Sequence, residues 1–124
     1  MITSTALDRQ RARPRAAQEL RPHAARAANL LKALGNEQRL LILCNLVGGP
    51  LSVGELNERV DLSQSALSQH LAVLREAGVV VTTKESQSVI YSLPPGITTR
   101  IIGLLHAEFC PAVAPRSASK PRKP

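Results

Sequence analysis

The sequence predicts a mainly α-helical domain that carries one β-hairpin. Apolar residues recur every three or four positions in several short segments, each bounded by glycine, proline or polar turn residues. Gly78 is then followed by two runs rich in valine and threonine, with a polar turn between them. This pattern indicates a small domain in which helices dominate and one hairpin is inserted.

Composition limits the chain to one domain with a small aliphatic core. The 124 residues are 44% hydrophobic but only 2% aromatic, so leucine, isoleucine, valine and alanine must fill the interior. No apolar run approaches the roughly 18 residues that a membrane helix needs. The arginine-rich start lacks the central apolar block of a secretory signal, so we expect a cytoplasmic protein.

The positive charge is concentrated at the two ends. Of the net +7, residues 1–26 carry +4 (six arginines against two acids), residues 111–124 carry +4, and residues 27–110 carry −1. We therefore expect flexible basic tails at 1–15 and 111–124 around a nearly neutral domain at 16–110. Such tails attract phosphates in a salt-dependent way, or only keep the protein soluble.

The first helix is predicted before Gly35. An apolar pattern at helical spacing runs from Ala16 to Leu34. Pro22 interrupts this pattern, so we expect the continuous helix from about His23, with the proline in its first turn.

The second and third helices follow recognisable start signals. Asn36 is a suitable N-cap for a helix from Glu37 to about Val47, and the LLILCNLV run predicts that this helix is buried on most of its circumference. Ser52 and Glu55 have the spacing of a capping box, which predicts a short helix to about Val60.

The fourth helix, the hairpin and the last helix complete the pattern. Ser63 is the expected N-cap of the fourth helix, and Gly78 ends that helix. Strands are predicted at Val79–Thr83 and Gln87–Leu93, around a turn at residues 84–86. A last helix is predicted from Ile97 to Phe109.

The fourth helix has two different faces. Leu67, Leu71 and Leu74 form an apolar stripe. The opposite face carries amides and hydroxyls, where a solvated helix usually shows Glu and Lys: Gln64, Ser65, Ser68 and Gln69. These groups suit base edges and phosphates in a major groove. We interpret the segment as a DNA-reading helix followed by a wing, a winged helix-turn-helix; a merely solvated face is the alternative.

The runs ALGNEQRLLIL and VGELNERVDLSQSALSQHLAVLREAGVV closely resemble the ArsR/SmtB family of small dimeric bacterial repressors. The similarity covers about residues 27–109. It implies four helices, a hairpin and a fifth helix, in that order. It also implies a homodimer through the first and last helices, and double-stranded operator DNA as the partner of the fourth.

The resemblance also assigns candidate DNA contacts. In the fourth helix they are Gln64, Ser65, Ser68, Gln69 and His70, and on the wing they are Lys84 and Gln87. For His70, packing beside Leu71 or a bridge to the backbone is an equally good interpretation.

The positions of the family's usual metal sites lack metal ligands in this chain. The thiol-rich motif of the third helix falls on Ser52-Val53-Gly54, and the last helix offers only His106 and Glu108 in place of carboxylate and histidine pairs. A transition metal needs three or four ligands in fixed geometry. We therefore expect no metal site and no cofactor.

Two cysteines remain, Cys44 in the second helix and Cys110 after the last. The pair resembles that of the persulfide- and redox-responsive repressors of the SqrR/BigR type. That resemblance implies that the reduced dithiol binds DNA, and that a pair bridged by reactive sulfur, from disulfide to tetrasulfide, releases it. Inert packing of Cys44 in its apolar run is the alternative. No basic group stands near either thiol in the sequence, so a lowered pKa is not predicted.

Three other interpretations stay open. The same dimer would sense peroxide, haem or a metal; or the chain would be a thiol oxidoreductase; or it would be a winged helix that binds proteins only. The enzymatic interpretation lacks a C-x-x-C motif and a glycine-rich cofactor loop, so we expect no enzyme.

Overall fold

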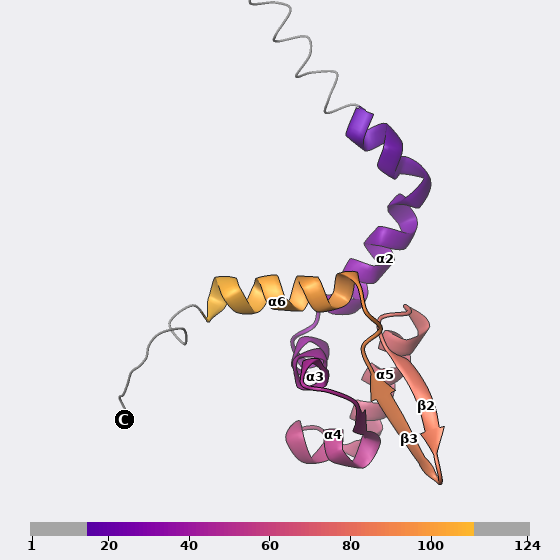
Figure 1. Ribbon diagram of the computed structural model, residues 1–124, viewed down its shortest axis with the longest axis vertical. Helices are drawn as coiled ribbons and strands as arrows, with labels where there is room; N and C mark the ends of the chain where they lie inside the picture. Colours follow the sequence, from indigo (N-terminus) through magenta and orange to yellow (C-terminus); the bar gives the residue numbers. More distant parts are fainter. Residues whose placement is uncertain (1–14, 111–124) are drawn as a thin grey trace, which may run out of the picture.

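The computed structural model describes residues 15–110, and the expected order of helices and strands is confirmed in it. The predicted basic tails fall almost entirely outside these residues. The elements are η1 (Arg21–His23), α2 (Ala24–Leu34), α3 (Glu37–Val47), β1 (Leu51–Ser52), α4 (Val53–Arg59), α5 (Gln64–Glu76), β2 (Val81–Glu85), β3 (Ser88–Ser92) and α6 (Ile97–Phe109). Figure 1 shows α3, α4 and α5 gathered beside the hairpin, with α2 and α6 extending beyond them.

The helix starts form as their side chains predict. The side-chain oxygen of Asn36 accepts a hydrogen bond from the backbone N–H of Arg39 at 3.1 Å. Ser52 and Glu55 make both bonds of a capping box, at 3.1 and 2.8 Å. Ser63 accepts from the Ala66 N–H at 3.1 Å. Each bond satisfies a backbone donor that a helix start leaves without an intrahelical partner.

The break at Pro22 is a short 3-10 turn. Residues 15–20 are helical, η1 contains the proline, and α2 begins at Ala24, within one residue of the predicted start. Because proline has no N–H to donate, the helix tightens there instead of continuing unchanged. The chain enters α2 along a helical segment whose residues are all exposed.

The predicted boundaries of both strands, and of the turn between them, are wrong by one or two residues. Val79 and Val80 form no strand; they lie in a bend and are 0% and 2% exposed, because they pack into the core. The turn lies at Ser86-Gln87, so Lys84 belongs to β2. Ser86 takes a left-handed φ of 56°, which the two-residue connection between paired strands requires.

The hairpin also gains a third strand that the sequence patterns did not predict. The two-residue β1 pairs antiparallel with β3 through Leu51 opposite Tyr91 and Ser52 opposite Ile90, giving the order β1-β3-β2. Since Ser52 also caps α4, the pairing fixes the short helix-turn-helix unit to the base of the wing.

An aliphatic core holds α5 in place. Leu67, Leu71 and Leu74 are at most 1% exposed. They pack among buried side chains of the other helices, of β1 and of the bend after α5. These further members are Ala33, Leu34, Ile42, Leu43, Leu46, Leu51, Leu56, Val79, Val80 and Ile102. The predicted stripe on α5 is therefore the face that anchors the helix.

The prediction for α3 is wrong on one side. Ile42, Leu43 and Leu46 are buried, but Leu41 is 48% and Val47 is 50% exposed, and Cys44 between them is exposed as well. Within one copy of the chain, α3 packs against α2, α4, α5 and α6, and these neighbours leave one side open. Apolar residues on that side account for the overestimate of burial.

Candidate nucleic-acid interface and thiol pair

The polar face of α5 lies at the surface of the domain. Gln64, Ser65, Ser68 and Gln69 are all exposed, on the side away from the leucine stripe. The first turn of α5 has no acidic residue, so nothing there opposes the partial positive charge of the helix start. The geometry presents four short hydrogen-bonding side chains on one open helix face.

His70 differs from these four. The side chain is half-buried, and its Nδ1 lies 3.5 Å from Nη1 of Arg39 on α3. The structure thus supplies a side-chain neighbour for His70, where the sequence had suggested packing, a backbone bridge or a DNA contact.

The two wing candidates are exposed at the far end of the hairpin. Lys84 lies in β2 opposite Val89, and Gln87 lies in the turn. Glu85 follows Lys84 directly, so the wing tip carries no net positive charge from this pair. The wing offers one cation and one amide to a partner.

Two further residues join the helix to the wing, and the sequence interpretation missed both. Ser68, Ala72, Arg75 and Glu76 of α5 line a shallow surface hollow together with Tyr91 of β3. Arg75 follows Ser68 by seven positions, with Ala72 between them, so helical spacing alone already placed it on the reading side. Tyr91 has no such signal, because its position depends on how β3 packs against α5.

The two thiols lie on helices that pack together. Cys44 is exposed on the open side of α3, and Cys110 is exposed directly after α6, where its N–H donates to the His106 carbonyl at 2.8 Å. Partial burial raises the pKa of Cys44, and the negative charge of the Cys110 thiolate raises it further. The exposure of Cys44 excludes inert core packing within one copy of the chain.

A second surface feature is apolar. On α6, Leu104 is 70% and Phe109 is 77% exposed; on α2, Leu31 is 58% exposed. Both helices extend beyond the rest of the domain in Figure 1. A partner that packed on α2 and α6 would cover these side chains.

The positions expected to lack a metal site have other roles or are exposed. The Ser52 hydroxyl is engaged in the capping box, Gly54 has no side chain, and His106 and Glu108 are exposed on α6. Among residues 15–110, no three His, Cys, Asp or Glu side chains gather as a metal ion would require. Across the same residues, no helix is long and apolar enough to cross a membrane.

The family model described as "Bacterial regulatory protein, arsR family" matches residues 36–82 of this chain, which run from the N-cap of α3 into β2.

Several relatives are similar over most of their length. The transcriptional activator HlyU of Vibrio cholerae is 54% identical over 95 residues, 77% of this chain and 88% of the relative. The biofilm growth-associated repressor of Agrobacterium fabrum is 45% identical over 70% of this chain and 74% of its own.

Solved structures of such relatives have the same fold. Reduced HlyU from Vibrio cholerae has a TM-score of 0.69 over 75% of this chain and 98% of its own. The transcriptional repressor BigR from Xylella fastidiosa is 38% identical, with a TM-score of 0.68 over 75% of this chain and 95% of its own.

Proposed function

We propose that this chain, which belongs to the ArsR family of bacterial regulatory proteins, is a homodimeric repressor switched by the dithiol Cys44 and Cys110. Its membership makes it a winged helix-turn-helix transcriptional regulator and not an enzyme. The finer statement is that the reduced dimer binds operator DNA, and that reactive sulfur bridges the two thiols and releases it. The observation that carries this proposal is a pair of exposed thiols, one on α3 and one directly after α6, on two helices that pack against each other.

Operator recognition is assigned to α5 and the wing. The amides and hydroxyls of Gln64, Ser65, Ser68 and Gln69 are exposed together, as a helix that reads base edges in the major groove requires. Lys84 and Gln87 reach the flanking backbone or minor groove from the wing, and Arg75 contacts phosphate near the end of α5. His70 contributes its free ring nitrogen.

Dimerisation is assigned to α2 and α6. The exposed Leu31, Leu104 and Phe109 are removed from water when a second copy packs on them. A two-fold dimer carries two reading helices, which bind half-sites about one turn of DNA apart, so both contacts depend on the angle between the protomers.

The switch is ordinary sulfur exchange. The Cys44 thiolate attacks the outer sulfur of a persulfide RSSH, takes it as Cys44–S–SH and releases RS⁻. The Cys110 thiolate then attacks the inner sulfur, forming the disulfide and releasing HS⁻. If both cysteines first become persulfides, a third RSSH oxidises them to a tetrasulfide, with RSH and H₂S as products.

The bridge acts on DNA binding through the helices that carry the thiols. Tying the end of α6 to α3 changes the position of a dimer helix against the body that holds α5. A bridge can shift the equilibrium only by its differential effect on the two arrangements, so the bound and released dimers must differ in protomer angle. The names of the relatives support regulation of either sign: HlyU is called an activator and the Agrobacterium protein a repressor.

The test uses the full chain and a duplex selected from a random pool by the reduced protein. Reduced wild type, protein treated with glutathione persulfide, and the variants Cys44→Ser and Cys110→Ser are titrated against this duplex at fixed salt. We expect persulfide to weaken wild-type binding at least tenfold and to leave both variants unchanged. Equal affinity of bridged and reduced wild type would contradict the proposal.

Mass spectrometry of the treated protein identifies the inducer. Peptides joined after persulfide, either directly or through extra sulfur atoms, but not joined after peroxide, indicate a sulfur sensor. Release that occurs with peroxide and gives a direct disulfide indicates a peroxide sensor. Release by haem or a metal, with both thiols unmodified, overturns the dithiol switch.

A further inference from the structure

We infer that Arg39 is a positioning residue for the reading helix: it ties the end of α2 to His70 on α5 and fixes the His70 imidazole in its Nε2–H tautomer. This inference rests on the proposed DNA-binding function of α5, but its structural half can be measured without DNA. It gives His70 a defined role in place of the two alternatives that the sequence left open.

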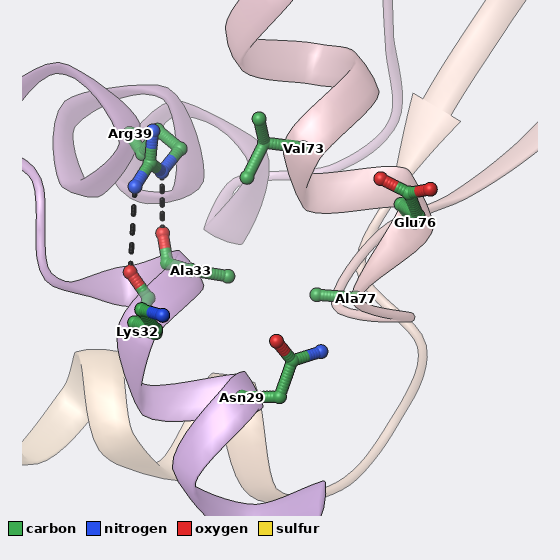
Figure 2. A pocket seen from close by; sticks show the side chains of 7 residues that line it. All are labelled: Asn29, Lys32, Ala33, Arg39, Val73, Glu76 and Ala77. Carbon is green, nitrogen blue, oxygen red and sulfur yellow. Dashed lines mark hydrogen bonds between the residues drawn. The ribbon is translucent and has the colours of Figure 1, made fainter.

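Arg39 lies where three helices meet. Its Nε donates to the carbonyl of Ala33 at 2.6 Å, and its Nη2 donates to the carbonyl of Lys32 at 3.3 Å. Both carbonyls belong to the last turn of α2, where a helix leaves carbonyls without an intrahelical partner. The Lys32 carbonyl also accepts from the backbone N–H of Gly35 at 3.2 Å, so the Arg39 bond to Ala33 is the stronger structural tie. Figure 2 shows the guanidinium bridging these two carbonyls. The rigid fork of arginine suits two neighbouring acceptors, so it fixes the angle between α2 and α3.

The third guanidinium nitrogen faces α5. Nη1 of Arg39 lies 3.5 Å from Nδ1 of His70, which is 31 residues further along the chain. The distance is long for a hydrogen bond, so this contact is the weakest of the three. Its direction is nevertheless informative, because arginine has donors only. Nδ1 must then accept, which leaves the ring proton on Nε2.

The tautomer determines what His70 offers to DNA. A ring with its proton on Nε2 donates from that nitrogen, and a phosphate oxygen accepts. His70 is half-buried, so the ring is partly held by the protein and partly open. It follows Gln69 directly, at the edge of the exposed polar face. The same side chain therefore packs against Arg39 and donates outward.

Arg39 lines a pocket between α2 and α5. This pocket, of about 310 Å³, is lined by Asn29, Lys32, Val73, Glu76 and Ala77 as well as Ala33 and Arg39. Figure 2 shows Val73 and Glu76 of α5 across this pocket from α2. α2 and α5 also contact each other directly, through the core that Ala33 and Leu34 share with the leucines of α5. The Arg39 bonds add polar contacts to this coupling between the dimer helix and the reading helix.

Arg39 also shares its helix with the sensor thiol. Cys44 is five residues further along α3, which at about 100° per residue places it on a different side. Arg39 faces α2 and α5, whereas Cys44 lies on the open side of α3. A displacement of α3 on bridging is therefore transmitted to His70 through Arg39.

The first test reads the tautomer directly. Imidazole ¹⁵N shifts of the reduced full-length protein are recorded at about pH 8, where a histidine of ordinary pKa is neutral. The His70 signal is assigned by its loss in His70→Gln. We expect the Nε2–H tautomer in wild type and a mixture in Arg39→Gln. Lys32→Gln is the matched control: it removes one positive charge from the same pocket but keeps the Lys32 carbonyl, so the tautomer should stay. An Nδ1–H tautomer in wild type overturns the inference.

The second test is a double-mutant cycle on the selected duplex. We expect Arg39→Gln and His70→Gln each to weaken binding about tenfold, which is about 1.4 kcal/mol, and the double variant to lose little more. Full additivity of the two losses overturns the coupling. If Arg39→Gln does not fold, Arg39→Lys keeps the charge; its single ammonium does not span the two carbonyls and His70 together, so the tautomer mixture is still expected.

The outcomes separate this inference from the proposed function. If the selected duplex is bound equally by wild type and by a variant lacking the Ser68 and Gln69 side chains, the assignment of the reading face fails, while the tautomer result stands. If the reading face is required but Arg39→Gln binds as tightly as wild type, the positioning role fails alone.

Discussion

The reactivity of Cys44 is determined by an apolar setting. Leu41 and Val47 flank it one turn away on either side, and both are about half exposed. Among the described residues, no cation contributes to lowering its pKa; burial and the Cys110 thiolate both raise it. A thiol in this setting is mostly protonated at neutral pH, which slows its reaction with any oxidant. Proximity to Cys110 then favours oxidants that leave a group the second thiol can displace.

A pH profile of alkylation tests this setting. Because the pKa of Cys44 is raised, its thiolate fraction at neutral pH is below that of a free cysteine, and the rate with iodoacetamide should keep rising above the ordinary cysteine pKa. The rate is followed by mass spectrometry in Cys110→Ser. Removing Cys110 also removes one cause of the shift, so the midpoint there stays high because of burial alone.

The same protein in urea is the control for that profile, since unfolding removes the burial. Its Cys44 should titrate at the ordinary value. A folded midpoint at or below the unfolded one contradicts the assigned environment.

The leucine stripe of α5 can also be tested one residue at a time. Leu71 is 1% exposed in the core, so Leu71→Ala removes packed atoms and leaves a cavity. We expect a loss of about 2–5 kcal/mol in the free energy of unfolding, measured by urea denaturation at one fixed protein concentration. Val73→Ala on the same helix is the matched control. Val73 is 39% exposed, and its loss should stay below about 1 kcal/mol.

At the scale of helices and strands, local signals were predictable and long-range packing was not. Asn36, Ser52 and Ser63 were predicted as caps because each bonds to a residue only three positions away. Leu51 pairs with Tyr91 across 40 positions, and no local pattern indicates such a pairing. The strand-like run at Val79 was misassigned for the same reason, since core packing overrides β propensity there.

The candidate site divides in the same way. The polar face of α5 follows from helical period, so all four of its members were found in the sequence. The contact between Arg39 and His70 joins two residues 31 positions apart, and the pairing of Cys44 with Cys110 was predicted only from the family resemblance. A single sequence specifies which side chains share a helix face, but not which faces meet.

The reading face predicts a specific effect on operator binding. Ser68→Ala together with Gln69→Ala removes hydrogen bonds to bases, so affinity for the selected duplex should fall about tenfold to a few hundredfold, while affinity for unrelated DNA changes little. Binding is measured by fluorescence anisotropy at one salt concentration. Thr99→Ala, an exposed hydroxyl on α6, is the control and should bind as wild type. An equal loss on both DNAs indicates that these side chains contact phosphate only.

At the scale of the whole molecule, one copy of the chain leaves apolar side chains of α2 and α6 exposed to water. α2 and α6 contribute few residues to the core, yet they expose Leu31, Leu104 and Phe109. Burying a large apolar side chain fully is worth about 1.5–3 kcal/mol, so covering several of them on two copies offsets much of the cost of association. In the proposed dimer, Cys110 lies at the end of α6, one of the two joining helices, and Cys44 lies on α3, which packs against α6.

Charged substitutions on α6 should separate the proposed dimer without unfolding the chain. Leu104→Asp and Phe109→Asp place charges on an exposed helix side, so α6 should still form, and far-ultraviolet circular dichroism should match wild type. A charge buried in an apolar interface is costly, so we expect sedimentation to show dimers for wild type and monomers for the variants at micromolar concentration. Val89→Asp makes the same kind of change on the wing, where Val89 is 37% exposed, and should stay dimeric. Because a monomer reads one half-site, the α6 variants should also lose most operator affinity with both thiols reduced. A wild type that is monomeric at these concentrations and still binds the selected duplex tightly would show that the exposed surface of α2 and α6 serves another partner.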